Sequence, residues 1–309
     1  MKKFYIRSIA LVAIATLAAA CGSSSGSSSS GYTVGTITQA VTDGLLSPNS
    51  PPPGANLSSC TLTSAHPYPV ILVHATFANE MLNWEALAPT LANAGYCVYT
   101  FDYGQTSASS IFYGLGDIAQ SAATLSTEVN SVLSETGASQ VDLVGHSQGG
   151  MMPNYYIKFL GGASKVHDFI GIAPSNHGTT LDGLTNLGNE LGVLDGINSV
   201  FSDLSLPSLA EQEVGSTFET NLFASGDTVP GPNYSVIETA DDEVVTPYTN
   251  AFLNGPGVDN ITIQNQCPND PVGHIGMAYD NVVIQDVLNI LGPNDPSFTP
   301  SCSGYGLSL

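Results

Sequence analysis

The chain has 309 residues, and 42% of them are hydrophobic, which suffices for one large α/β domain. Its formal net charge of −21 comes from 26 acidic and only 5 basic residues. Such a surface repels nucleic acid and anionic membranes and favours neutral substrates, so we expect no nucleic-acid partner.

The first twenty residues have the pattern of an export signal. A basic start precedes an apolar run at residues 9–20, which is too short to span a bilayer as a mature helix. Cys21 follows three alanines, as the lipidated first residue of a bacterial lipoprotein does. We therefore predict a signal peptide at residues 1–20, lipidation of Cys21, and export as an outer-membrane or cell-surface lipoprotein. Free secretion stays open, because Ala18 stands where that signal usually has leucine.

Residues 21–59 are rich in serine and then in proline, which predicts a flexible tether that stiffens into a spacer. Setting Cys21 aside leaves four cysteines, enough for two disulfides in an oxidising compartment. Three pairings exist. We favour Cys60–Cys97 and Cys267–Cys302, because the members of each pair lie in one region of the chain.

From residue 60 onward, apolar runs alternate with helical patterns. Strands are predicted at residues 69–73, 96–104, 141–144, 166–173, 234–239 and 258–264. Helices are predicted at about residues 83–95, 117–137, 151–160 and 277–291. This alternation requires right-handed crossovers and a mostly parallel, doubly wound sheet that binds ligands at the carboxyl ends of its strands. Residues 60–309 are thus expected to form one α/β domain.

Capping residues mark two of these helices. Asp117 is the expected N-cap of the second helix and Gly137 its end, while Asn83 and Gly95 play the same parts in the first. Residues 179–232 break the alternation, with leucines at helix-like spacing. They predict either ordinary helical packing or a cap over an acyl-binding pocket.

The stretch Gly145-His146-Ser147-Gln148-Gly149 lies between a predicted strand and a predicted helix. This is the setting of a nucleophile elbow, in which a serine occupies a strained turn and glycines allow close backbone approach. Ser147 is the expected nucleophile. The backbone N–H of Gln148, at the start of a helix, is suited to hold an oxyanion.

A nucleophilic serine needs a base and an acid that orients the base, and in this arrangement they follow the serine in the order acid, histidine. Of six histidines, His274 lies in a late loop after every candidate acid. Asp242 is the preferred acid, with Asp241 as the runner-up. We expect no metal, because three adjacent acids at residues 241–243 give poor geometry for calcium.

The second oxyanion donor is expected in the loop after the first strand. Thr76 is the candidate, through its backbone N–H and its hydroxyl, and the alternative is that Thr76 only caps that turn.

Several motifs, spread from Cys60 to Cys302, resemble the bacterial secreted lipases of class 2, which have the α/β-hydrolase fold. They are Val70-Ile71-Leu72-Val73-His74-Ala75-Thr76-Phe77-Ala78-Asn79, Gly145-His146-Ser147-Gln148-Gly149-Gly150, Ala173-Pro174-Ser175-Asn176-His177-Gly178-Thr179, Asp242-Glu243-Val244-Val245-Thr246-Pro247-Tyr248 and Gly273-His274-Ile275-Gly276. The resemblance implies hydrolysis of triacylglycerols or other carboxylic esters without a cofactor. It places the acid at Asp242, the base at His274 and the oxyanion donors at Thr76 and Gln148.

One position departs from the family, which usually has glycine where this chain has Ala75. If that backbone needs positive φ, the alanine Cβ costs about 1 kcal/mol and displaces the oxyanion loop. The alternatives in substrate are solid polyesters, such as polyhydroxyalkanoate, polyethylene terephthalate or cutin, and short soluble esters. The remote alternative is a catalytically decayed surface lipoprotein that binds lipid.

Overall fold

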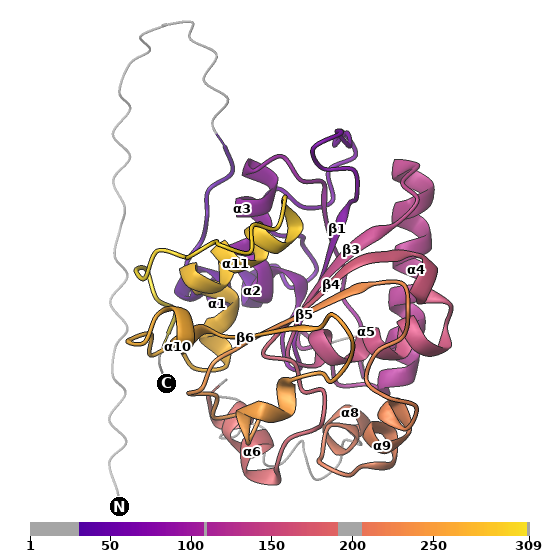
Figure 1. Ribbon diagram of the computed structural model, residues 1–309, viewed down its shortest axis with the longest axis vertical. Coiled ribbons are helices and arrows are strands. Elements are labelled where there is room, and N and C mark those ends of the chain that lie inside the picture. Colours follow the sequence, from indigo (N-terminus) through magenta and orange to yellow (C-terminus); the bar gives the residue numbers. More distant parts are fainter. Residues whose placement is uncertain (1–30, 108–109, 191–205, 308–309) are drawn as a thin grey trace, which may run out of the picture. The chain divides into compact units, whose positions relative to one another are not determined.

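The computed structural model describes residues 31–107, 110–190 and 206–307 (Figure 1). The predicted signal peptide and Cys21 lie outside the described residues. None of the helices in the described ranges is long and apolar enough to cross a membrane.

A parallel sheet of six strands, in the order β2-β1-β3-β4-β5-β6, forms the centre of the described chain. The strands are β1 (Val70–Val73), β2 (Val98–Thr100), β3 (Val141–His146), β4 (Val166–Ile172), β5 (Asn233–Glu238) and β6 (Asp259–Thr262). Most of their side chains are buried, as parallel strands covered on both faces require. The predicted doubly wound parallel sheet is confirmed.

Helices cover both faces of this sheet (Figure 1). On one face α4 (Ile118–Thr136) and α5 (Gln148–Phe159) pack against Ile71 and Val73. On the other face α3 (Leu87–Asn93) and α11 (Asn281–Leu291) pack against the alternate residues of the same strand. The period of two along β1 thus divides its side chains between two apolar cores.

The predicted boundaries of α4 are confirmed. The Asp117 carboxylate accepts the Gln120 N–H at 2.8 Å, and Gly137 ends the helix with φ of 71°. The predicted N-cap Asn83 is wrong, because Asn79 caps the shorter helix α2 (Glu80–Trp84) by accepting the Leu82 N–H. The helical conformation is interrupted between α2 and α3, where the sequence predicted one continuous helix.

The remaining elements are short. They are α1 (Ile37–Leu46), α6 (Leu181–Glu190), α8 (Pro207–Glu211), α9 (Thr217–Phe223), α10 (Ile263–Gln266) and the 3-10 turns Gly162–Ser164, Tyr248–Ala251 and Ile275–Tyr279. The last of these turns precedes α11, which therefore begins four residues later than predicted. Segment 179–232 contains α6, α8 and α9, and residues 191–205 of the predicted cap lie outside the described chain.

The tether prediction is wrong for residues 31–59. Residues 37–46 form helix α1, and the Asn93 side chain exchanges hydrogen bonds of 2.7 and 2.8 Å with the backbone of Tyr32. Ala55 lies in a parallel bridge with Val98. These residues lack long apolar runs, so their composition predicted a flexible tether. Their small side chains nevertheless allow them to pack closely against the rest of the domain.

Both predicted disulfides are present. Cys60 is bonded to Cys97 and Cys267 to Cys302, closing separations of 37 and 35 residues. The first disulfide links the segment before β1 to the residue that precedes β2. The second links the C-terminal segment to the residue that follows α10.

Candidate active site

Ser147 lies between β3 and α5 in the geometry of a nucleophile elbow. Its backbone has φ of 56° and ψ of −122°, a region that residues with a side chain rarely occupy. A Cβ at Gly145 would lie 1.8 Å from the Gly149 carbonyl oxygen, and one at Gly149 would lie 2.1 Å from that of Val73. A side chain at either position would clash with a backbone carbonyl, so both positions require glycine.

The structure brings His274 and Asp242 together from two loops at the carboxyl ends of the strands. The His274 Nδ1 and the Asp242 Oδ2 are 2.7 Å apart, and both side chains are fully buried. The other Asp242 oxygen accepts the N–H groups of Val244 and Val245 at 2.8 and 2.7 Å. Burial acts to raise the pKa of Asp242, but the His274 imidazole and these N–H groups outweigh it and lower that pKa.

The runner-up Asp241 and the third acid of this run, Glu243, do not take this place. Asp241 is exposed, whereas Glu243 uses its carboxylate to accept the backbone N–H of His274 at 3.0 Å. Of the three consecutive acids, Asp242 is the one that contacts the imidazole, and Glu243 holds the loop that carries the imidazole.

His146, next to the serine, has a supporting position. Its Nε2 lies 3.1 Å from the His274 carbonyl oxygen and its Nδ1 lies 3.3 Å from the Asn83 Oδ1. Burial, followed by the neighbouring His274, lowers the pKa of His146 to about 3, so this ring stays neutral at ordinary pH.

The side chains of Thr76 and Gln148, the two predicted oxyanion residues, are in contact. The Thr76 hydroxyl accepts a hydrogen bond of 2.9 Å from the Gln148 side chain, which also donates to the Gly114 carbonyl at 2.8 Å. Gln212, at the end of α8, donates to the same hydroxyl at 3.1 Å. The loop after β1 is thus fixed by two glutamines that are buried with it.

The alanine that departs from the family pattern carries no left-handed strain. Among the described non-glycine residues, positive φ occurs at Asn56, Phe77, Ser147, Ala173 and Asn294, and Ala75 is not one of them. The unusual conformation falls two residues later, at Phe77, whose N–H donates to the Tyr113 carbonyl at 2.9 Å. The Cβ of Ala75 is therefore tolerated.

Sequence reasoning missed Glu238, the last residue of β5. Its side chain is fully buried next to the Asp242 carboxyl. Its Oε1 accepts the Thr239 N–H at 2.7 Å, and its Oε2 has no hydrogen-bond partner among the described residues. An acidic residue at the end of the apolar run of residues 234–237 is the signal that could have identified it.

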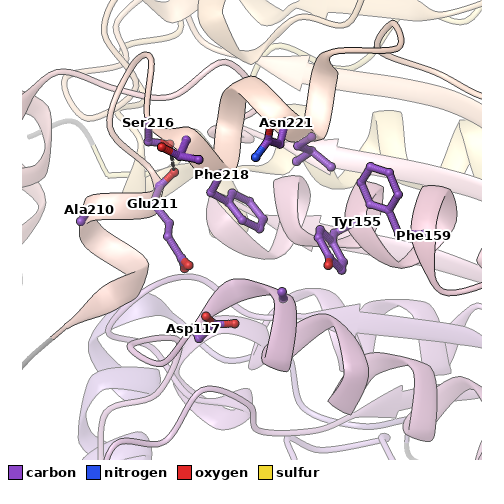
Figure 2. Close-up of a pocket in the computed structure, with 11 residues that line it drawn as sticks. Asp117, Tyr155, Phe159, Ala210, Glu211, Ser216, Phe218 and Asn221 are labelled. Atoms are coloured by element: carbon purple, nitrogen blue, oxygen red, sulfur yellow. Dashed lines mark hydrogen bonds between the residues drawn. The ribbon is translucent and has the colours of Figure 1, made fainter.

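A small cavity of about 50 Å³ adjoins these residues. His274 and Thr76 line it on one side and Ile37 and Val41 of α1 on another. A cavity of about 660 Å³ lies elsewhere, among α4, α5, α8 and α9, with aromatic rings and two carboxylates around it (Figure 2). None of the predicted catalytic and oxyanion residues lines that second cavity, whereas Thr76 and His274 line the first.

One cluster of ligand-type side chains lies at the opposite ends of β3 and β4. Asp142, His167 and Asp168 have ligand atoms within 4.8 Å of one another. The His167 Nδ1 lies 3.0 Å from one carboxylate and 3.2 Å from the other, which makes an ion-paired group within the described chain.

Comparison with known proteins points to one family. The model of the class 2 lipases matches residues 67–285. Triacylglycerol lipases of Pseudarthrobacter phenanthrenivorans and Burkholderia plantarii are each 36% identical to the chain over 93 residues, or 28% of it. That match covers 27% and 24% of the two lipases, so the chain spans about a quarter of the curated relatives it matches.

Solved structures agree with this fold. Lipase B of Aspergillus fumigatus superposes with a TM-score of 0.61 at 23% identity, over 77% of this chain and 57% of that one. The mature lipase BlEst2 of Bacillus licheniformis gives a TM-score of 0.56 at 16% identity, over 75% and 94%. At these identities the likeness establishes the α/β-hydrolase fold.

Proposed function

Because the chain belongs to the class 2 lipase family, we propose that it hydrolyses carboxylic esters, and triacylglycerols before others, through Ser147, Asp242 and His274. The observation that carries the proposal is the buried hydrogen bond of 2.7 Å between His274 and Asp242. It lies in the same group of loops as the strained turn of Ser147. A base oriented by a buried acid is what a serine hydroxyl needs to become a nucleophile.

The reaction is acyl transfer in two steps. His274 takes the Ser147 proton as Oγ attacks the ester carbonyl, and the backbone N–H groups of Gln148 and Thr76 hold the oxyanion. His274 then gives the proton to the leaving alcohol. Water hydrolyses the acyl-enzyme by the same route, while Asp242 stays ionised and stabilises the imidazolium.

The substrate is a neutral ester because the chain is strongly acidic, with 26 acidic against 5 basic residues. Acyl length depends on segment 179–232, so short soluble esters and solid polyesters are the competing substrates. A lipase hydrolyses long-chain emulsions and leaves polyester film intact, and the reverse pattern would identify a polyester hydrolase.

Export with a lipid on Cys21 belongs to the same proposal. The two disulfides are compatible with an oxidising compartment. Cys21→Ala is expected to move the protein from the membrane fraction to the medium and to abolish labelling by a palmitate analogue. A membrane-bound, labelled variant would show that Cys21 is not the attachment point.

Ser147→Ala tests the mechanism directly. Against p-nitrophenyl esters of increasing acyl length, the variant is expected to lose at least about 10³-fold in kcat. A fluorophosphonate probe should label the native protein and not this variant. Ser121→Ala, which removes a buried serine of α4, should keep the label. Activity that survives in Ser147→Ala would overturn the mechanism.

A further inference from the structure

Helix α1 exposes its large apolar residues to solvent and buries its small ones, which is unusual for a helix that packs only on its own domain. Its buried residues are the small Ala40 and Gly44, whereas Val41, Leu45 and Leu46 are 43%, 46% and 77% exposed. A helix stabilised by packing normally buries its large apolar side chains and exposes its small or polar ones. In α1 this arrangement is inverted.

The small residues seat the helix closely on α2 (Figure 1). A Cβ at Gly44 would lie 2.8 Å from the Cβ of Leu82, and the Gly44 carbonyl accepts a hydrogen bond of 3.0 Å from Asn79. The helix is therefore held in place by backbone contacts, which leaves its leucines free of a packing role.

The exposed face borders the cavity of about 50 Å³ that adjoins His274. Within α1, Ile37, Val41 and Leu45 follow one another at spacings of four residues. Ile37 and Val41 line the cavity that His274 and Thr76 also line, while Leu45 is exposed. One apolar stripe thus leads from the surface to the cavity beside His274 and Thr76.

We infer that α1 is the surface through which the protein contacts its substrate as a neutral lipid aggregate, an inference that rests on the proposed ester hydrolysis. A stripe that begins at the cavity lined by His274 and Thr76 places such an aggregate next to residues that we assign to catalysis. The helix has one charged residue, Asp43, and no basic one. It therefore matches the surface of a neutral ester droplet, since anionic headgroups attract basic helices and repel an acidic chain.

The test compares Leu45→Gln/Leu46→Gln with a matched control, Leu160→Gln/Val214→Gln. Glutamine keeps helix propensity in α1. The control removes the same number of exposed apolar residues, 37% and 55% exposed, that do not line the catalytic cavity. Rates are measured on soluble p-nitrophenyl butyrate and on emulsified triolein, with binding to triolein droplets and to phosphatidylglycerol vesicles.

The α1 variant is expected to keep its rate on the soluble ester within about twofold and to lose about tenfold on the emulsion and in droplet binding. The control should keep both rates. An emulsion rate equal to that of the control, an equal loss on both substrates, or preferential binding to phosphatidylglycerol would each overturn the inference. If the native protein hydrolyses neither ester, the proposed function itself fails.

A second, independent observation concerns Asp242, the acid that orients His274. The Glu238 and Asp242 carboxyls are buried next to each other, and the Glu238 Oε2 has no N–H or O–H donor in the described part of the chain. Two carboxyls that share a buried site cannot both be ionised, so one of them holds a proton. Asp242 already accepts two N–H groups and contacts His274, so the proton belongs on Glu238. Burial, followed by the neighbouring Asp242, raises the pKa of Glu238 well above its usual value.

We propose that Glu238 is a positioning residue, a neutral acid that donates its proton to the Asp242 carboxylate and thereby sets how strongly Asp242 holds His274. The ionisable groups that face it are Asp242 and Glu243 on the following loop, with His274 beyond Asp242. Removing the donor leaves more negative charge on Asp242, which stabilises protonated His274.

Two variants of similar shape separate this role from packing. Glu238→Gln keeps a donor and is expected to leave the acid limb of the kcat/KM profile in place. Glu238→Met lacks a donor, and its acid limb should move upward by about half a pH unit, with an up to about threefold lower kcat/KM at pH 6. Equal shifts in both variants, or a lower rate in Glu238→Met without a shift, would overturn the proposal.

Discussion

At the residue scale, the Thr76 hydroxyl meets glutamines from two distant parts of the chain. Gln148 comes from the elbow helix, and Gln212 comes from α8, 136 residues away in sequence. Gln212 also accepts a hydrogen bond of 3.0 Å from the Ser175 hydroxyl. The segment after β4 therefore helps to place the backbone that we assign to the oxyanion.

Gln212→Leu is expected to lower kcat about tenfold with little change in KM, because an oxyanion donor acts in the transition state and a displaced donor loses part of its effect. The measurement is steady-state kinetics on a soluble ester. Thr76→Val removes the same hydroxyl and keeps the backbone N–H. If Gln212 acts through that hydroxyl, the double variant is no slower than Thr76→Val, whereas additive losses would contradict this coupling.

At the element scale, the elbow depends on the approach of α5 to β1. Gly149, in the first turn of α5, lies against the Val73 carbonyl so closely that any Cβ would clash with backbone. Gly137, at the end of α4, is needed for a different reason, since it has φ of 71° and open space around it. Gly149 is therefore required because a side chain would clash with the backbone, and Gly137 because its backbone conformation disfavours a side chain.

Gly149→Ala is expected to destabilise the protein by about 3 kcal/mol or more, because strand and helix must move apart. Gly137→Ala should cost about 1 kcal/mol, the penalty of a side chain in the left-handed region. Urea unfolding of both variants gives the comparison. Equal losses would mean that α5 has room to shift, and the close approach would not then be a requirement of the fold.

At the scale of the whole molecule, buried ionisable groups set the pH range of stability. Burial raises the pKa of Asp102 to about 7 and that of Asp286 to about 6. Burial lowers the pKa of His74 to about 4 and that of His146 to about 3. The raised acids bind protons more readily in the folded state, and the lowered histidines bind them less readily.

As the pH falls from 8 to 6.5, Asp102 takes up a proton in the folded chain before the unfolded chain does, which adds to the stability of the folded state. The unfolded chain protonates His74 and His146 around their ordinary pKa of 6.5, so from about pH 7.5 downward their effect opposes that of Asp102. We therefore expect the change in melting temperature from pH 8 to pH 6.5 to be about 2–4 °C more positive in the native protein than in Asp102→Asn. Calorimetry measures both changes, and equal changes in the two proteins would assign the effect to other groups.

The sequence by itself determined what depends on neighbours in the chain. The apolar runs gave the parallel strands, Asp117 and Gly137 bounded α4, and the glycines around Ser147 indicated the elbow. Each of these features is local, because a cap, a strand pattern or a tight turn is specified within a few residues.

Only the tertiary structure decided which distant side chains meet. Asp242, rather than its acidic neighbours, faces His274, because the loop after β5 turns one carboxylate inward. Glu238 meets that carboxylate, and α1 folds from a segment whose composition predicted a tether. Composition indicates whether a segment would be ordered in isolation. Close packing against the folded domain can stabilise a helix that would not form alone.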